Sequence, residues 1–444
     1  MLARWTVAIA IAVGAVVILL YSTSRAQSSA LDQMIFVSEA FAGDRSDGCG
    51  AISVLDTSNP NTVVFRGISK PSLWRLAASD DLAVVIASAG AGNKSYMYRL
   101  RQDLATGGWR ADTVKNLANF FVTAGGVAIV DDGRALVASV GTYVRHEPGI
   151  ARIRMPANDN AIVTLDDIDA SDPLGHDVTM QILRSPDGEE LISVTDKGKV
   201  FTHHLSDLSR SRVPLAVPTV SFDPARPPAS GSEYVRATLS PGGRYLILAQ
   251  GEAPSLVVVD RTAQRVSTID VSNWLTMTGG VAFNAGWQNR GLLAVHGGGR
   301  VMVFNFVPDN DLEALASISI DGPPWPVDRS RAGSGPVAWS GDGSRLIAGV
   351  SSDADDFAIF NVSECGRHIE LDRQIAVCPS HRNFPADIVT ANGHIPTPEG
   401  FVSQCPTPSW SDDYVPGPHQ TATASPTAPP FLPYVIVMPT LLTE

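Results

Sequence analysis

Short apolar runs alternate with compact polar turn signals along most of this chain. Five of the turn signals begin at Ser79, Asp131, Ser185, Ser240 and Ser340, and each contains Asp or Gly. An apolar run follows each of them, at residues 82–88, 136–140, 191–195, 245–249 and 346–350. Asp-Gly and Gly-Gly between apolar runs are typical of β-hairpins, because a type I′ turn needs a positive φ at both central positions. The pattern therefore predicts antiparallel strand pairs joined by tight turns.

These hairpins belong to a longer repeat. Successive turns lie about 50 to 55 residues apart, and one longer gap holds a degenerate copy at residues 284–289. A further strand follows each hairpin and occurs in seven copies, at residues 51–56, 96–100, 150–154, 199–203, 255–260, 300–304 and 356–360. A fourth strand, such as residues 266–270 or 315–320, closes each unit. Four short strands repeated radially predict an all-β fold, a seven-bladed β-propeller with four-stranded antiparallel blades.

Three segments resemble the repeats of a known superfamily. They are the Ser-Pro-Asp-Gly turn at residues 185–188, its relative at residues 240–243 and the strand Ser-Leu-Val-Val-Val-Asp at residues 255–260. In these segments the chain is similar to seven-bladed propellers of the YVTN, WD40-like and lactonase-like kinds, although no Trp-Asp dipeptide stands at the repeat positions. The resemblance covers roughly residues 35–393 and implies the fold, whereas repeat signatures say little about function.

The phase of the repeat predicts how the ring closes. The first strands, residues 35–41 and 51–56, correspond to the second and third strands of a blade, so the first blade lacks its innermost strand. Residues 385–393 have the form of an innermost strand with its turn, and they follow residues 369–377, the last strand of the seventh blade. We expect this C-terminal strand to pair with the N-terminal strands, which leaves no open sheet edge.

The four cysteines, Cys49, Cys365, Cys378 and Cys405, form no CxxC or CxxCH motif. Zinc ribbons, thioredoxin-like redox pairs and covalent c-type haem therefore lack their signatures. In an oxidising compartment we expect two disulfides, with buried thiols as the alternative. Because strands alternate in direction, Cys49 and Cys378 fall on one face and Cys365 and Cys405 near the other. This predicts the pairs Cys49–Cys378 and Cys365–Cys405.

Both ends of the chain differ in composition from the repeat region. Arg4 precedes an uncharged run at residues 5–21, and small residues follow up to Ala30. We therefore expect residues 1–30 to be a signal peptide or an uncleaved N-terminal membrane anchor. We expect residues 31–395 to form the propeller and residues 396–444, which are rich in Pro, Thr and Ser, to form an extended tail. The predicted location is extracytoplasmic, either secreted or associated with the cell envelope.

Charge and motifs narrow the chemistry. The net charge of −12 and the lack of a Lys/Arg cluster disfavour nucleic-acid binding. The Asp-rich stretch at residues 166–172, with His176 and Asp177, lacks the spacing of an EF-hand and predicts a solvated loop, as does the stretch at residues 351–356. Adjacent strand residues point to opposite faces, so His203 and His204 are interpreted as blade-surface residues. No catalytic, metal or cofactor motif is found, so no cofactor is predicted.

The mouth of the central channel is the expected binding site. In this phase of the repeat, the starts of the innermost strands bring together Trp74, Arg75, Asp177, Gln181, Glu233, Arg236 and Asp387. Mixed charges with one aromatic side chain suit a polar ligand or a peptide. The alternative is that these residues pair with one another as ordinary strand ends.

Three functions are compatible with these features. The leading hypothesis is an exported, non-catalytic propeller that binds a protein or polysaccharide partner at the cell envelope. The first alternative is a lactonase-like hydrolase with its site in the channel, and a divalent metal among clustered channel carboxylates would favour it. The second is a structural subunit of a membrane complex, attached through the N-terminal apolar segment.

Overall fold

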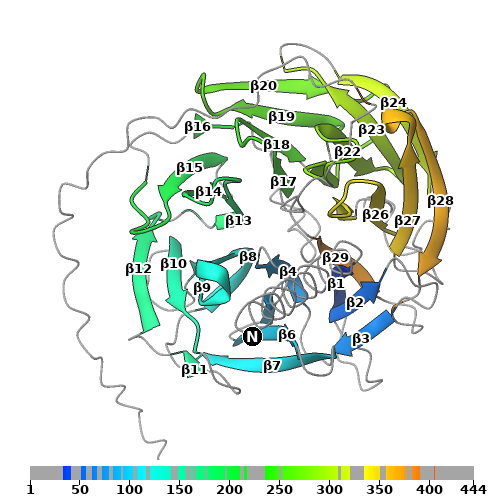
Figure 1. Ribbon diagram of the computed structural model, residues 1–444. Helices are drawn as coiled ribbons and strands as arrows, with labels where there is room; N and C mark the ends of the chain where they lie inside the picture. The colour runs from blue at the N-terminus through cyan, green and yellow to red at the C-terminus, as the bar shows by residue number, and fades with distance from the viewer. Residues whose placement is uncertain are drawn as a thin grey trace, which may run out of the picture.

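Seven β-sheets surround a central axis in the computed structural model of this chain (Figure 1). The structure describes most residues between 34 and 390, together with Cys405; the longest gaps are at residues 218–235 and 321–334. In six of the described sheets the first four strands from the axis outward follow one another in chain order, and one of these sheets has a fifth, outer strand. The sequence-based expectation of an all-β, seven-bladed propeller is confirmed.

From the axis outward, the first blade contains β29 (Asn383–Val389), β1 (Met34–Phe41), β2 (Ile52–Asp56) and β3 (Val63–Gly67). The second contains β4 (Leu73–Ala78), β5 (Val84–Ala91), β6 (Lys94–Gln102) and β7 (Trp109–Asn116). The third contains β8 (Phe121–Val130), β9 (Ala135–Gly141), β10 (Gly149–Arg154) and β12 (Ile168–Pro173). The fourth contains β13 (Thr179–Arg184), β14 (Glu190–Thr195), β15 (Lys199–His204) and β16 (Leu215–Ala216).

The fifth blade contains β17 (Arg236–Leu239), β18 (Tyr245–Ala249), β19 (Ser255–Asp260) and β20 (Arg265–Asp270). The sixth contains β21 (Gly280–Phe283), β22 (Leu292–Gly297), β23 (Arg300–Phe306) and β24 (Leu312–Ser319). The seventh contains β25 (Val337–Trp339), β26 (Arg345–Gly349), β27 (Phe357–Ser363) and β28 (His368–Ile375). Two short 3₁₀ helices, η1 (Asp131–Gly133) and η3 (Glu364–Gly366), follow β8 and β27.

The ring closes through the first blade. Strand β29 runs antiparallel to β1, with Val389 opposite Phe36 and Asp387 opposite Ser38, and β1 pairs in turn with β2. In Figure 1, β29 lies beside β1 although the two strands come from opposite ends of the chain. The predicted closure by a C-terminal strand is confirmed, and it covers an inner edge that β1 would otherwise expose.

The hydrophobic core is divided among the blade interfaces, with one cluster of buried side chains between each pair of neighbouring blades in the described part of the chain. In β18, Tyr245 and Ile247 face the sixth blade, whereas Leu246 and Leu248 face the fourth. Alternate residues of a strand point to opposite faces of a sheet. A strand between two interfaces is therefore apolar on both faces, which explains why the runs after the turns are continuous and do not alternate.

The conformation of the hairpin turns differs from the predicted type I′ geometry. Only the last residue of the turns at residues 185–188 and 240–243 has a positive φ, 77° at Gly188 and 82° at Gly243. The amide of Gly188 donates to the carbonyl oxygen of Ser185 at 2.9 Å. The expected type I′ geometry is therefore wrong, because the central residues keep a negative φ. Pro186 suits the second position of a type I turn, and the glycine that follows takes the left-handed conformation.

The structure near the third blade differs from the sequence-based prediction in two respects, the Asp-rich stretch and an additional short strand. The Asp-rich stretch is not a loop in its described part, because residues 168–173 form β12, the outermost strand of this blade. Residues 351–356 lie outside the described residues. The two-residue strand β11 (Ile162–Val163) leaves the third blade and pairs in parallel with β7 of the second blade, so that sheet has five strands. This pairing covers part of the outer edge of β7.

The Cys365–Cys405 disulfide is present and joins Cα atoms 5.3 Å apart, as predicted. It ties η3 of the seventh blade to the chain beyond β29. Cys49 and Cys378 lie outside the described residues, so their pairing stays a prediction. Residues 1–33 also lie outside them, and no helix in the described part is long and apolar enough to cross a bilayer.

Candidate functional site in the central channel

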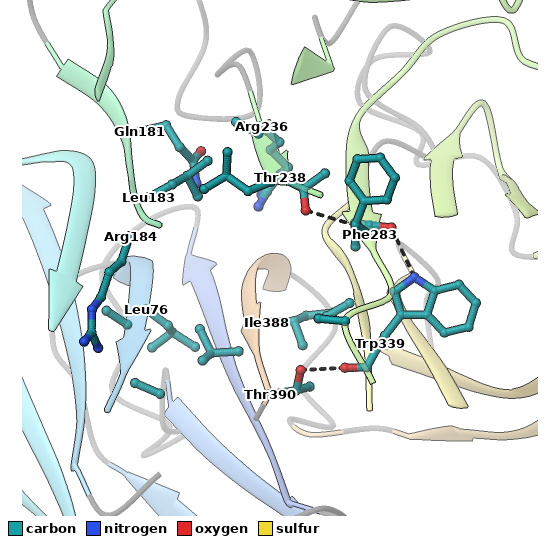
Figure 2. Close-up of a pocket in the computed structure, with 18 of the residues that line it drawn as sticks. Leu76, Gln181, Leu183, Arg184, Arg236, Thr238, Phe283, Trp339, Ile388 and Thr390 are labelled. Carbon is teal, nitrogen blue, oxygen red and sulfur yellow. Dashed lines mark hydrogen bonds between the residues drawn. The ribbon is translucent and has the colours of Figure 1, made fainter. Parts of the chain in front are cut away.

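The innermost strands enclose a cavity of about 470 Å³ along the axis. Side chains from β4, β13, β17, β21, β25 and β29 surround it (Figure 2). Its charged lining residues, within the described part of the chain, are Arg75, Arg184, Arg236, Arg290 and Asp387. Four of these five side chains are cationic, although the whole chain has a net charge of −12. The cavity therefore favours anions, because a lined cleft focuses the field of its own charges.

The carboxylate of Asp387 is fixed from two sides of the channel. Its Oδ1 lies 3.2 Å from Nη1 of Arg236, on β17 of the fifth blade. Its Oδ2 accepts a hydrogen bond of 2.9 Å from the amide of Leu76, on β4 of the second blade. Since Asp387 itself belongs to β29 of the first blade, the ion pair with Arg236 crosses the channel. These contacts hold one carboxylate in place against the cavity.

A second arginine lies at the same end of the channel. Arg75 on β4 is 4% exposed, and its Nε finds no hydrogen-bond partner in the structure as described. Burial and, to a smaller extent, the positive charge of Arg75 lower the pKa of Arg236 to about 10, although the charge and hydrogen bond of Asp387 oppose this shift. Arg236 is still protonated at neutral pH. Two guanidinium groups therefore lie at this end of the channel, and of the two only that of Arg236 is paired with the carboxylate of Asp387.

His296 stands next to this end of the channel but is not part of the cavity lining. It is 1% exposed, and its Nδ1 lies 3.0 Å from the carbonyl oxygen of Gly335. Burial, with a smaller contribution from the charge of Arg236, lowers the pKa of His296 to about 4, although the hydrogen bond to Gly335 opposes this shift. His296 is therefore neutral at pH 7.

Four of the seven expected rim residues meet in the cavity lining, namely Arg75, Gln181, Arg236 and Asp387. Asp177 does not, because it is buried against Lys199, whose Nζ lies 2.7 Å from Asp177 Oδ2. Glu233 and the side chain of Trp74 lie outside the described residues. The alternative expectation was that the rim residues pair with one another. It holds for Arg236 and Asp387, whereas no such pair is seen for Arg75 among the described residues. Ligand binding by these residues stays a prediction.

The backbone of β13 carries Gln181 into the cavity because β8 allows a close approach. A Cβ atom built on Gly126 of β8 would lie 2.0 Å from the amide nitrogen of Ile182, the residue after Gln181. Only glycine fits such a contact between two backbones. The sequence shows a glycine just before an apolar run, at Gly126, but it does not show that the strand of the next blade packs against this glycine.

Sequence reasoning did not anticipate the hydrogen bonds that join innermost strands of neighbouring blades. The indole of Trp339 donates to the carbonyl oxygen of Ala282 at 3.1 Å, and the hydroxyl of Thr390 donates to the carbonyl oxygen of Trp339 (Figure 2). On the preceding strand, the hydroxyl of Thr238 accepts from the amide of Phe283 at 3.1 Å. These bonds connect β17, β21, β25 and the end of β29, so they fix the wall of the cavity. Such hydrogen bonds need only a polar side chain near the end of an innermost strand, so no sequence motif marks them.

A Ser–His–Asp arrangement lies elsewhere, between the third and fourth blades. Oγ of Ser193 is 2.7 Å from Nε2 of His203, and Nδ1 of His203 is 3.3 Å from Oδ2 of Asp172 without hydrogen-bond alignment. These are the groups of a nucleophilic triad. Both Ser193 and His203 are completely buried, however, and neither lines the cavity. The arrangement therefore links β12 of the third blade to the fourth blade, and the interpretation of His203 as a blade-surface residue is wrong.

Among the residues that the structure describes, no three His, Cys, Asp or Glu side chains gather as metal ligands would. The charged groups that converge on the cavity are guanidinium groups and one carboxylate. The arrangement can bind an anion and can hold a water molecule against a carboxylate.

No protein-family model matches the sequence, and a search of curated proteins found no similar one. Solved structures do match. The periplasmic gluconolactonase of Pseudomonas aeruginosa superimposes with a TM-score of 0.55 and 16% identity, over 80% of this chain and 98% of that one. A proposed 6-phosphogluconolactonase of Bacteroides uniformis gives 0.54 and 12%, with the same coverage. The chain shares their propeller fold.

A functionally unknown protein of Desulfotomaculum acetoxidans is similar to the same degree, with a TM-score of 0.52 and 13% identity over 81% of this chain and 98% of that one. The propeller of this chain therefore corresponds to nearly the whole length of each of these three structures. At such identities the likeness establishes the fold, and function has to be argued from the site.

Proposed function

We propose that this protein is a lactonase-like hydrolase that opens the lactone ring of a sugar acid in the central channel. The observation that carries the proposal is the cavity lining that contains Arg75, Arg236 and the fixed carboxylate of Asp387, the one acidic group among the described lining residues. The fold supports it, since two structures with the same architecture are named as a gluconolactonase and a proposed 6-phosphogluconolactonase.

Lactone hydrolysis turns a neutral ester into an anion, and the cavity has the charge for that change. Negative charge develops on the carbonyl oxygen as water attacks and ends on the product carboxylate. Fixed donors stabilise such charge most strongly where water is largely excluded. The guanidinium groups of Arg236 and Arg75 supply donors of this kind, and Arg236 keeps its charge at neutral pH.

Asp387 is the candidate general base. A water molecule held by the carboxylate attacks the carbonyl carbon and gives its proton to Asp387. The bond between the carbonyl carbon and the ring oxygen then breaks, and the ring oxygen takes the proton back from Asp387. One water is consumed, the carboxylate is regenerated, and the product is an open-chain hydroxy acid. The contacts from Leu76 and Arg236 orient the carboxylate for this role.

The comparisons favour this function over the non-catalytic scaffold that the sequence suggested first. The scaffold hypothesis rested on the lack of a catalytic motif, and a site set by geometry needs no motif. Export, attachment to the membrane and partners at the cell envelope stay predictions from residues 1–30.

The test is hydrolysis of glucono-δ-lactone and 6-phosphogluconolactone by the purified full-length chain, with acid release followed in a pH-stat above the spontaneous rate. We expect Asp387→Asn to lower kcat/KM about 100-fold or more, because the general base is lost. The matched control is Asp169→Asn on β12, which removes an aspartate from a partly exposed pair with Arg154. It should leave the rate unchanged. An unaccelerated rate with both lactones, or full activity of Asp387→Asn, contradicts the proposal.

A further inference from the structure

Arg75 is a buried cation without a counter-ion among the described residues. It is 4% exposed and lines the cavity, and its Nε has no hydrogen-bond partner. The one carboxylate at this end, Asp387, is taken by Arg236. An unpaired buried charge is strongly destabilising unless something neutralises it. A bound anion would do so.

Gln181 lies at the same level of the channel. Arg75, Gln181 and Arg236 each stand four residues before the serine that begins the next turn, at Ser79, Ser185 and Ser240. Equivalent positions of the innermost strands lie at equal depth in the ring, and Figure 2 shows Gln181 and Arg236 at one end of the cavity. The Oε1 atom of Gln181 is buried without a hydrogen-bond partner in the described structure.

We propose that Arg75 and Gln181 form a subsite for the anion of an open-chain polyhydroxy acid, with the carboxylate at Arg75 and a hydroxyl group at the carboxamide of Gln181. An arginine offers several donors and no acceptor, whereas a carboxamide offers both. A ligand that satisfies both side chains needs an anionic acceptor and, beside it, a hydroxyl group. A polyhydroxy acid carries the two on neighbouring carbons.

The inference rests on the proposed function in one respect, because such an acid is what hydrolysis of a sugar lactone produces. An unphosphorylated lactone such as glucono-δ-lactone has no charge to offer Arg75, and its product does. The product therefore binds more tightly than the substrate and inhibits competitively. This adds regulation by product to the channel site.

The test is calorimetric titration of the full-length chain with D-gluconate at neutral pH. D-glucitol, which has the hydroxyl groups without the carboxylate, and acetate, which has the carboxylate without hydroxyl groups, are the ligand controls. We expect gluconate to bind at least 10-fold more tightly than either. Arg75→Met should weaken gluconate at least 10-fold, whereas Gln181→Leu should weaken gluconate and leave acetate unchanged. Arg154→Met, at an exposed arginine paired with Asp169, is the matched control and should bind as the wild type does.

Thermal unfolding separates a ligand site from a structural role. Without ligand, Arg75→Met should unfold at the same temperature as the wild type or at a higher one, because an unpaired buried charge has been removed. Gluconate should raise the Tm of the wild type and leave that of Arg75→Met unchanged. A lower Tm of unliganded Arg75→Met, equal gluconate binding by that variant, or equal binding of glucitol overturns the subsite.

The two proposals fail separately. Gluconate binding that depends on Arg75, in a protein without lactonase activity, leaves the subsite standing and overturns the hydrolase. Lactonase activity that depends on Asp387, without gluconate binding that depends on Arg75, overturns only the subsite.

Discussion

At the scale of single residues, the channel end is defined by groups whose charge the surrounding fold controls. Asp387 is oriented by an amide of one blade and a guanidinium of another, and the charge of Arg75 lowers the pKa of Arg236. His296 is buried behind them and is kept neutral. A cation added at His296 would stand close to Arg236, so this end of the channel is sensitive to acid.

His296 should make the stability of the protein depend on pH. Its pKa is lowered to about 4 in the folded protein, from 6.5 otherwise, so between these values the unfolded chain binds more protons. Stability contributed by the neutral ring is therefore complete above pH 6.5 and is lost as the pH falls towards 4, by about 3 kcal/mol in all. Urea unfolding of the wild type and of His296→Gln, from pH 4 to 7.5, measures this slope.

The matched control for this pH series is His368→Gln, at a histidine whose side chain is 55% exposed. We expect the curve of His368→Gln to follow the wild type and that of His296→Gln to be flatter below pH 6.5. Parallel curves for all three proteins contradict a neutral, buried His296.

At the scale of strands and turns, the sequence predicted most elements because local chemistry determines them. Ser240 illustrates this, since its hydroxyl accepts from the amide of Tyr245 at 3.0 Å and so joins the two ends of a hairpin. The serines of three other turns do the same. Strand β11 has two residues and no period to detect, and it was missed. The predicted turn type was wrong because it was based on the glycine alone, whereas Pro186 at the second position favours a type I turn.

Gly126 lets us test how an element positions the site. We expect Gly126→Ala to lower the free energy of unfolding by about 1 to 3 kcal/mol, because the new methyl group meets the backbone at Ile182 and the two strands must separate. Gln181 moves with its strand, so gluconate binding should weaken as well. Denaturant unfolding and calorimetry measure the two effects. Gly175→Ala, where a Cβ meets no atom within 4 Å but φ is 71°, is a control for backbone strain without a clash.

For Gly126→Ala, loss of stability with unchanged gluconate affinity would show that β13 does not need this contact to place Gln181. A fully stable Gly126→Ala variant would contradict the close approach of the two strands.

At the scale of the whole molecule, the ring brings together residues that no local pattern connects. The rim residues Arg75, Gln181, Arg236 and Asp387 could be found from sequence because strand phase alone decides which strand starts meet. Two further properties depend on side-chain packing and were out of reach: the pairing of Asp177 with Lys199 in the fourth blade, and the burial of His203 against Ser193 of its own blade and Asp172 of the third blade. Depth in the ring follows from the repeat, whereas side-chain contacts within and between blades follow from packing.

Closure is the weakest point of such a ring, because β29 and β1 are joined by hydrogen bonds and packing but not by the chain. The Cys365–Cys405 disulfide closes a separation of 40 residues and ties the segment after β29 to the seventh blade. The double variant Cys365→Ala/Cys405→Ala should lose roughly 2 to 4 kcal/mol of stability, since the unfolded chain gains freedom.

Hydrogen exchange shows where the ring of this double variant opens. Amides of β29 and β1 should exchange faster relative to those of β18 in the fifth blade, because local opening at the closure no longer meets a covalent tie. The wild type under non-reducing conditions is the reference for every peptide. Uniformly faster exchange in all blades would mean that the disulfide stabilises the propeller as a whole and not its closure. Unchanged exchange together with unchanged stability would mean that β29 is held by the first blade alone. The expected gradient from β29 to β18 would show that the ring opens where the two ends of the chain meet.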